Sequence, residues 1–297
     1  MRSNIDNSEE LIRLSLLDHA AFPSVPALAY DGGTVYVPME AHDEAVLLLT
    51  KHTGWIVQHR FDNVPKDDKN PIIRERKTIL GYGTCIQSIH YRENADRLHQ
   101  EFSAETEVRW CWRTRDIHAT RAYLQAEGLE TGEVYPGPGH AEYFDFWLLD
   151  RRVRLTVQQD AAVGEDEPRL VPSWTRIGVR NVSAARNWYE TYVGMRLIED
   201  HTSSGYVIMG LALEHHPDEV SLWVLEQTSV ARTTSRQNGA ARPACVLHDK
   251  HQFAAYHAYL KQQGIETAEI MGYPPIKGYS WFHYYDPDGN RFDVMRY

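Results

Sequence analysis

The last stretch of the chain, Phe282–Tyr297, reads FHYYDPDGNRFDVMRY and combines a turn sequence with two aromatic-rich runs. Proline fixes its own φ angle, while glycine and asparagine tolerate the backbone angles of tight turns, so DPDGN predicts a turn. The runs on either side predict two strands joined by that turn. The second strand carries one acid, Asp293. The rest of the sequence must decide whether this acid binds a metal, transfers protons or is an ordinary polar residue.

Two segments far apart in the chain repeat one another. Ala122–Val134 (AYLQAEGLETGEV) and Ala258–Ile270 (AYLKQQGIETAEI) share Ala, Tyr, Leu, Gly, Glu, Thr and Glu in place, and a Pro/Gly loop and an aromatic run follow each. A weaker similarity relates Glu44–Val57 to Ala184–Ile198, where an apolar helix face precedes a glycine and a strand. The repeats predict four units of one plan: a strand, a helix, then two or three strands. The units span about residues 33–95, 107–160, 173–230 and 242–297.

A linker rich in Asp, Glu and Pro, Asp160–Pro172, separates the first two units from the last two. The expected organisation is an N-terminal extension (1–30), a first domain (31–160) and a second domain (173–297). The extension reads as a short amphipathic helix and lacks the features of a signal peptide, so the expected location is the cytoplasm.

Composition excludes several classes of function. The chain has 297 residues, of which 42% are hydrophobic, and a net charge of −10 without a basic patch, so nucleic acid is not an expected partner. No apolar stretch is long enough to span a membrane. The three cysteines, Cys85, Cys111 and Cys245, form no CxxC pair, which argues against a disulfide framework and against a thiolate zinc site.

The order of these elements resembles the vicinal oxygen chelate superfamily, which includes glyoxalase I, bleomycin resistance proteins and type I extradiol dioxygenases. Ile177–Gly194 is similar to the opening strand and helix of this family, and Trp281–Met295 to its closing hairpin. The resemblance implies an α+β fold in which four βαβββ modules form two glyoxalase-like domains with half-open β cups. It makes the first domain degenerate and places the site in the second. In metal-using members, ligands from the first and last strands of the modules point into the cup.

Carried over position by position, the resemblance gives a poor set of metal ligands. Trp174 and Trp223 stand at the ligand positions of the third unit, and Cys245 and Asp293 at those of the fourth. The corresponding residue of the second unit is Arg109. The two-histidine, one-carboxylate triad of iron enzymes is therefore absent from the matching positions.

A rearranged site for Fe²⁺, Mn²⁺ or Zn²⁺ would have to use Asp293, His283 and His248. The alternative for His248 is a residue near a helix N-terminus that Asp249 caps. His283 stands where the dioxygenase ending has a tyrosine, ten residues before the ligand position. An adjacent carboxylate would orient a histidine and raise its pKa, so His283 and Asp293 are the predicted catalytic pair. The simpler alternative is that both only line a solvated cup.

The remaining predicted lining of the cup is largely aromatic and suits a flat ligand. The residues predicted to bind substrate are Trp174, Arg176, Trp223, Cys245, Tyr273 and Tyr279. Arg176 would bind a carboxylate or a phenolate. For each tryptophan the alternative is core packing, and for Arg176 it is an exposed strand position.

Two functions follow as expectations. The first is a protein that binds a small aromatic molecule after loss of the usual metal triad, as in the bleomycin resistance group, with or without acid–base catalysis. The second is a metal-dependent enzyme of glyoxalase or dioxygenase type with the rearranged ligand set. Whether the chain is an enzyme, and of dioxygenase, lyase or isomerase type, stays open. The expected partner is a small molecule, and a homodimer is left open.

Overall fold

The structure is a computed structural model that describes residues 28–66, 72–80, 84–93, 106–150, 152–214, 220–228, 236, 238–272 and 279–297. Four units follow one another along the chain, each with one α-helix between its first strand and its later strands. Unit one contains β1 (Ala29–Tyr30), β2 (Thr34–Tyr36), η2 (Met39–Ala41), α2 (His42–Thr53), β3 (Val57–Asn63), β4 (Ile72–Leu80) and β5 (Cys85–Tyr91). Unit two contains β6 (Val108–Thr114), α4 (Ile117–Ala126), β7 (Glu130–Thr131), β8 (Tyr135–Pro136), η4 (Pro138–His140), β9 (Glu142–Leu148) and β10 (Val153–Gln159).

The second half of the chain repeats this order. Unit three contains β11 (Val171–Val179), α5 (Val182–Tyr192), β12 (Arg196–His201), η5 (Thr202–Ser204), β13 (Tyr206–Ala212) and β14 (Val220–Gln227). Unit four contains β15 (Ala241–Arg242), β16 (Ala244–Val246), α6 (Lys250–Gln262), β17 (Met271–Gly272), β18 (Ser280–Tyr285) and β19 (Arg291–Arg296). The four predicted βαβββ units and the α+β class are confirmed.

The helix ends explain why the sequence repeats could be recognised. Among the described residues, a glycine with positive φ follows each of the four α-helices: Gly54, Gly128, Gly194 and Gly264. Glycine adopts this left-handed conformation without the steric cost of a Cβ atom, which makes it the common residue after a helix. At the other end, Asp116, Asn181 and Asp249 cap α4, α5 and α6 by accepting backbone N–H groups.

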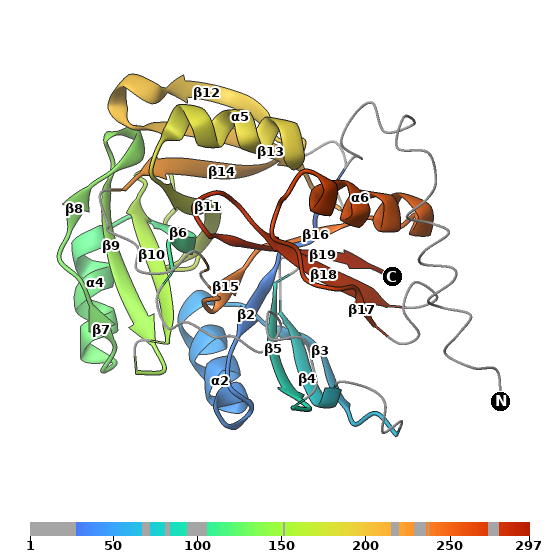
Figure 1. The fold of residues 1–297 in the computed structure, drawn as a ribbon. Helices are drawn as coiled ribbons and strands as arrows, with labels where there is room; N and C mark the ends of the chain where they lie inside the picture. Colours follow the sequence, from blue (N-terminus) through green and yellow to red (C-terminus); the bar gives the residue numbers. More distant parts are fainter. Residues whose placement is uncertain are drawn as a thin grey trace.

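The sheets pair the units differently from the order in which they follow along the chain (Figure 1). Units two and three form one nine-stranded sheet, because their first strands β6 and β11 pair antiparallel. Units one and four exchange short strands: β1 pairs with β16, and β15 pairs with β2. Each β cup is therefore built between the two halves of the chain. The expectation that neighbouring units share a cup is wrong, because hydrogen bonding between first strands, and not sequence order, decides the pairing.

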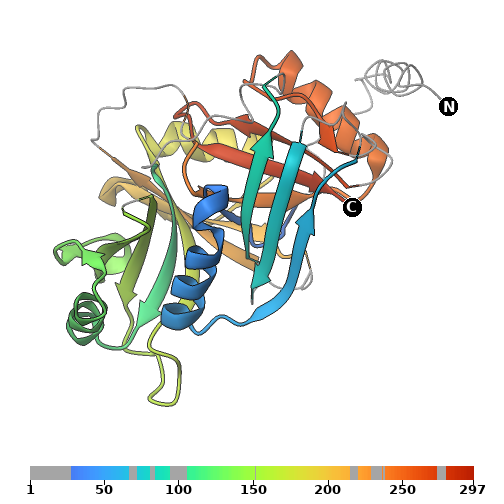
Figure 2. The ribbon, with the colours of Figure 1, turned by 90° about the horizontal axis from the view of Figure 1, so that it is seen from below.

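The helices fill two hydrophobic cores, both on the sheet faces that are turned away from the cups. One core contains α2 and α4 residues together with strands of units one and two, and Figure 2 shows α2 between the strands of those units. The other contains α5 and α6 residues with strands of units three and four. Each half of the chain thus contributes most of one core. The domain boundaries at 31–160 and 173–297 stay a prediction.

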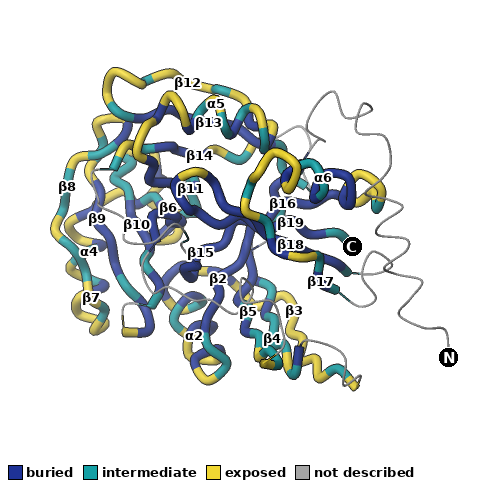
Figure 3. Tube along the Cα trace, viewed as in Figure 1, coloured by how far each residue is buried: buried dark blue, intermediate teal, exposed yellow. Residues whose placement is uncertain are grey.

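Burial follows this architecture. The central strands β6, β11, β16, β18 and β19 are largely buried, whereas the edge strand β3 is exposed along its whole length (Figure 3). Among the described residues, no helix has both the length and the apolar character needed to cross a membrane.

Candidate functional site

The closing hairpin places His283 and Asp293 opposite each other. The two residues are register partners on β18 and β19. Their neighbours Phe282, Tyr284, Phe292 and Val294 pack into the core with α5 and α6. Because side chains alternate along a strand, His283 and Asp293 share the other face, which is the cup between units one and four.

Of the other predicted site residues, Trp174, Arg176, Trp223, Cys245 and His248 do not gather around this pair. Trp223 and Cys245 are buried in the core with α5 and α6, on the helix side of their strands, so they do not line a cup. Trp174 packs against Tyr206, Ile208 and Val224, on the opposite face of the nine-stranded sheet from that core. Arg176 also lies there, in the cup between units two and three.

His248 and Tyr273 complete the predicted set. His248 is exposed; its Nε2 contacts the Glu214 carboxylate and its Nδ1 lies 3.4 Å from the Tyr297 carbonyl oxygen. Asp249 caps α6, as the alternative reading of this segment predicted. Tyr273 lies outside the described residues.

A small hollow opens on the cup face between units one and four. Its volume is about 10 Å³, room for no more than one water molecule. The walls come from β2, β5, β15, β18 and β19, with Tyr279 just before β18. The lining residues are Thr34, Tyr36, Gln87, Ile89, Tyr91, Arg242, Tyr279, Trp281, Arg291, Asp293 and Met295. Two of the predicted site residues, Asp293 and Tyr279, are among them.

The charged groups of this hollow are held in different ways. Arg291 donates from Nε to Asp293 Oδ1 at 2.8 Å and from Nη1 to Asn238 Oδ1 at 3.2 Å. Arg242 donates from Nε to the Gly239 carbonyl oxygen at 3.0 Å, and its guanidinium lies 3.8 Å from the Tyr36 ring centre. Burial and the neighbouring Arg291 lower the pKa of Arg242 to about 10. Burial opposes the charge of Arg291 too, but the Asp293 carboxylate raises its pKa above the usual value.

The comparisons with known proteins fit this architecture. Residues 172–294 match the model of the Glyoxalase/Bleomycin resistance protein/Dioxygenase superfamily. Residues 172–294 belong to this superfamily. A search of curated protein sequences gave no match.

Solved structures show a similar fold over most of the chain. Glyoxalase I from Zea mays is 17% identical, covers 91% of this chain and 92% of its own, and has a TM-score of 0.58. A putative dioxygenase from Bacillus subtilis is 10% identical, covers 91% of this chain and 85% of its own, and has a TM-score of 0.57. At these identities the likeness shows the fold alone.

Metal chemistry in the superfamily needs several side chains that donate electron pairs to one ion. Asp293 is the only acid among the residues that line the hollow, and two guanidinium groups share the space with it. Those cations would repel a divalent metal. Over the described ranges, no group of three His, Cys, Asp or Glu side chains is arranged to hold an ion. The described lining of the hollow does not fit a divalent metal, and neither do Asp293, His283 and His248 as a set, because His248 contacts Glu214 and Tyr297 instead.

The second cup, between units two and three, contains a network of ion pairs. Arg109 and Arg176 are register partners on β6 and β11. Arg176 contacts Glu226 from Nε at 3.1 Å, and Arg109 Nη1 lies 3.5 Å from Asp145 Oδ1. Asp145 also accepts from Thr156 Oγ1 at 2.5 Å. Arg109 and Arg154 help to hold the pKa of Asp145 below its usual value despite burial. Each of these arginines is therefore paired with a carboxylate, although Arg109 Nε has no hydrogen-bond partner among the described residues.

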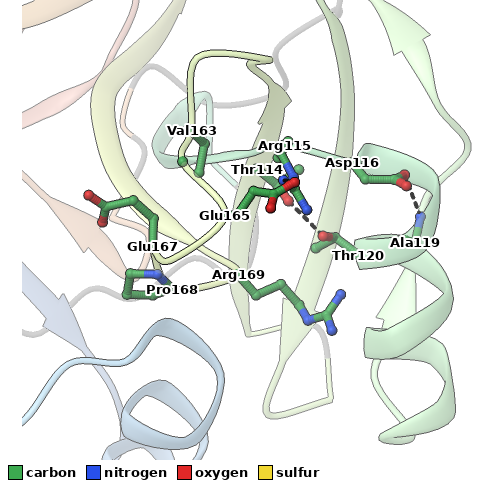
Figure 4. A pocket seen from close by; sticks show the side chains of 11 residues that line it. Thr114, Arg115, Asp116, Ala119, Thr120, Val163, Glu165, Glu167, Pro168 and Arg169 are labelled. Carbon is green, nitrogen blue, oxygen red and sulfur yellow. Dashed lines mark hydrogen bonds and ion pairs between the residues drawn. The ribbon is translucent and has the colours of Figure 1, made fainter.

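A wider cleft of about 310 Å³ lies on the surface, between the start of α4 and the linker after β10 (Figure 4). Several of its polar groups already have partners within the protein. Thr114 and Thr120 are joined by a hydrogen bond of 2.7 Å, Asp116 accepts the Ala119 N–H, and Arg115 pairs with Glu165 at 2.6 Å. This cleft is larger than the hollow between units one and four, but it presents an exposed polar surface and not a binding site with buried, specific groups.

Sequence reasoning missed Arg242 and Arg291. Arg291 stands two residues before Asp293 on the same strand, so period-two alternation could have placed it on the cup face. The resemblance placed Cys245 at the inward-facing ligand position on the first strand of unit four, and this assignment left no inward position for Arg242. Pro243 interrupts this strand between β15 and β16, and the inward positions are Ala244, Val246 and, before the break, Arg242.

Proposed function

We propose that this protein binds a small aromatic molecule in the hollow between units one and four and does so without a metal ion. The observation that carries this proposal is the wall of the hollow, in which Tyr36, Tyr91, Tyr279 and Trp281 stand together. Tyr279 and Trp281 lie with their ring centres 5.4 Å apart and a tilt of 36°. Large aromatic walls suit flat apolar ligands, which bury much of their surface against them.

The small volume of the hollow sets a condition on binding. A ligand of several ring atoms needs more space than about 10 Å³, so binding requires the side chains of the wall to rotate or the two sheets to separate. Met295 lines the hollow and lies 3.2 Å from the Tyr279 hydroxyl through its sulfur. Methionine is unbranched and adaptable, so this side chain is suited to yield when a ligand enters.

The experiment measures ligand binding and metal content on the same preparation of the full chain. A panel of small aromatic compounds is titrated by calorimetry against the wild-type protein and against Trp281→Ala. The proposal expects at least one compound to bind, with a loss of about tenfold or more in the variant. Trp188→Ala serves as the control for loss of a tryptophan, because Trp188 packs against Tyr189 and Tyr192 in the core with α5 and α6, away from the hollow.

Elemental analysis of the same preparation tests the second part of the proposal. About one equivalent of iron, manganese or zinc that disappears in Asp293→Ala would contradict metal-free binding and support the metal-dependent alternative. Failure of the whole panel to bind would contradict the aromatic site. The catalytic role predicted for His283 and Asp293 stays a prediction, because His283 is fully buried and lies beside, not in, the lining of the hollow.

A further inference from the structure

The hollow between units one and four contains one more buried cation than its neighbours neutralise. Arg291 is paired with Asp293. Lys77 and Glu75, on β4, are charged residues outside the lining of the hollow. The Glu75 carboxylate accepts from Gln87 at 2.7 Å. The Lys77 ammonium lies 5.5 Å from the Tyr279 ring centre. Glu75 is among the acids that raise the pKa of Lys77, against the effect of burial. The remaining cation is Arg242.

Arg242 has the features of a ligand-binding group. Its side chain is 2% exposed and lines the hollow. Nε donates to a backbone carbonyl and the plane of the guanidinium stacks on Tyr36, but Nη2 has no hydrogen-bond partner among the described residues. Asp293 acts on Arg242 too, but it is hydrogen-bonded to Arg291, so one carboxylate faces two buried cations. An excess buried charge is costly, and proteins retain such groups mainly where they have a function.

We propose that Arg242 binds an anionic group, a carboxylate or a phenolate, on the aromatic ligand of this hollow. The inference rests on the proposed function and names the chemical class of the ligand. The guanidinium is always charged and offers planar, paired N–H donors that match a carboxylate. Its position against Tyr36 places that anion at the aromatic wall, so one ligand would use both features at once.

A purely structural role makes opposite predictions. If Arg242 only braces the Gly239 carbonyl, its loss destabilises the protein and leaves ligand binding unchanged. If Arg242 instead binds an anionic ligand group, Arg242→Met removes a buried charge that is unbalanced in the free protein and keeps most of the side-chain volume. The melting temperature of the free protein then rises, while the affinity for anions falls.

The test uses probe pairs of equal shape and different charge, 1-naphthoate with 1-naphthamide and benzoate with benzamide, titrated by calorimetry. The proteins are the full wild-type chain, Arg242→Met, Arg242→Lys and Arg196→Met, the last because Arg196 is exposed on β12. The wild type is expected to bind an acid about tenfold more tightly than its amide. Arg242→Met abolishes that preference without weakening the amide, Arg242→Lys retains part of it, and Arg196→Met matches the wild type.

The outcomes separate this inference from the proposed function. Equal binding of acid and amide, or an unchanged acid affinity in Arg242→Met, would overturn the anion site and leave the aromatic site standing. Absence of binding for all four probes at millimolar concentration would count against both. If Arg242→Met does not fold, the preference of the wild type for the acid and a reduced preference in Arg242→Lys decide the question.

Discussion

Arg109 of β6 and Arg176 of β11 lie opposite each other at the centre of the nine-stranded sheet, and both guanidinium groups reach the same carboxylate oxygen, Glu226 Oε2. Glu226 therefore neutralises two cations that the pairing of units two and three brings together. Without it, Arg109 and Arg176 would repel each other in a buried environment.

Glu226→Gln is expected to lower the free energy of unfolding by about 3 kcal/mol, because it leaves the buried Arg176 without its carboxylate partner and Arg109 with Asp145 alone. Urea denaturation measures this loss. Glu165→Gln is the control, since Glu165 pairs with Arg115 on the surface with 85% and 49% of their side chains exposed, and exposed pairs contribute about 0–1 kcal/mol. Equal losses in the two variants would show that the network does not hold the two halves of the sheet together.

Gly33 marks the crossing between units one and four. Its φ is +80°, and a Cβ atom there would lie 2.8 Å from the Arg242 carbonyl oxygen and 3.1 Å from the Pro243 Cα. Gly33→Ala is expected to cost about 3 kcal/mol or more, since a positive φ and a clash with the backbone of β15–β16 act together. Gly128→Ala has a similar φ of +84° and open space around the added Cβ, so its cost is about 1 kcal/mol. Thermal unfolding of both variants measures the difference; equal shifts would mean that the close approach at Gly33 relaxes at no cost.

His42 gives the protein a pH-dependent stability. Its Nδ1 lies 2.8 Å from Ser88 Oγ and its Nε2 lies 2.9 Å from Thr78 Oγ1, and burial lowers its pKa from 6.5 to about 4. Between these two values the unfolded chain binds the proton and the folded chain does not, so stability falls as the pH decreases from about 6.5 to 4. The difference in urea midpoint between wild type and His42→Gln is expected to grow with pH across this window. A difference that does not change with pH would contradict a neutral buried His42.

Asp286 of the closing turn makes stability depend on pH in the direction opposite to that of His42. The Asp286 carboxylate accepts the N–H groups of Asp288 and Asn290, the Asn290 amide and the Tyr189 hydroxyl, yet burial raises its pKa from 3.8 to about 6. The folded state retains this proton longer than the unfolded state, so the contribution of Asp286 to stability decreases as the pH rises from about 4 to 6 and then stays constant.

The effects of Asp286 and His42 oppose each other over the same range, so the wild-type curve alone resolves neither. The carboxyl carbon shift of Asp286, followed by NMR, is expected to titrate near pH 6. Titration of Asp286 below pH 4 would show that its four hydrogen bonds outweigh burial.

The sequence could predict the units because their signals are local. DPDGN fixes the turn between β18 and β19 through the backbone preferences of five neighbouring residues. A glycine with positive φ lies one or two residues after each described α-helix. The opposition of His283 and Asp293 followed from the same local hairpin. Arg291, two residues from Asp293, was within reach of the same reasoning.

The sequence could not predict which units pair with each other. Which first strands pair is decided by hydrogen bonds between residues far apart in the chain, such as Arg242 opposite Thr34 and Arg109 opposite Arg176. Neighbouring side chains along a strand point to opposite faces of a sheet, so the register of the strand decides which residues reach the cup. Cys245 points into the core, whereas Arg242, three residues earlier, lines the hollow.

The sequence by itself determined four βαβββ units, the closing hairpin and the acid at its inner face, because turn chemistry and strand alternation act between near neighbours. Only the tertiary structure decided that the cups lie between units two and three and between units one and four. It also decided that Asp293 shares its hollow with two arginines, since long-range strand pairing brings these charges together.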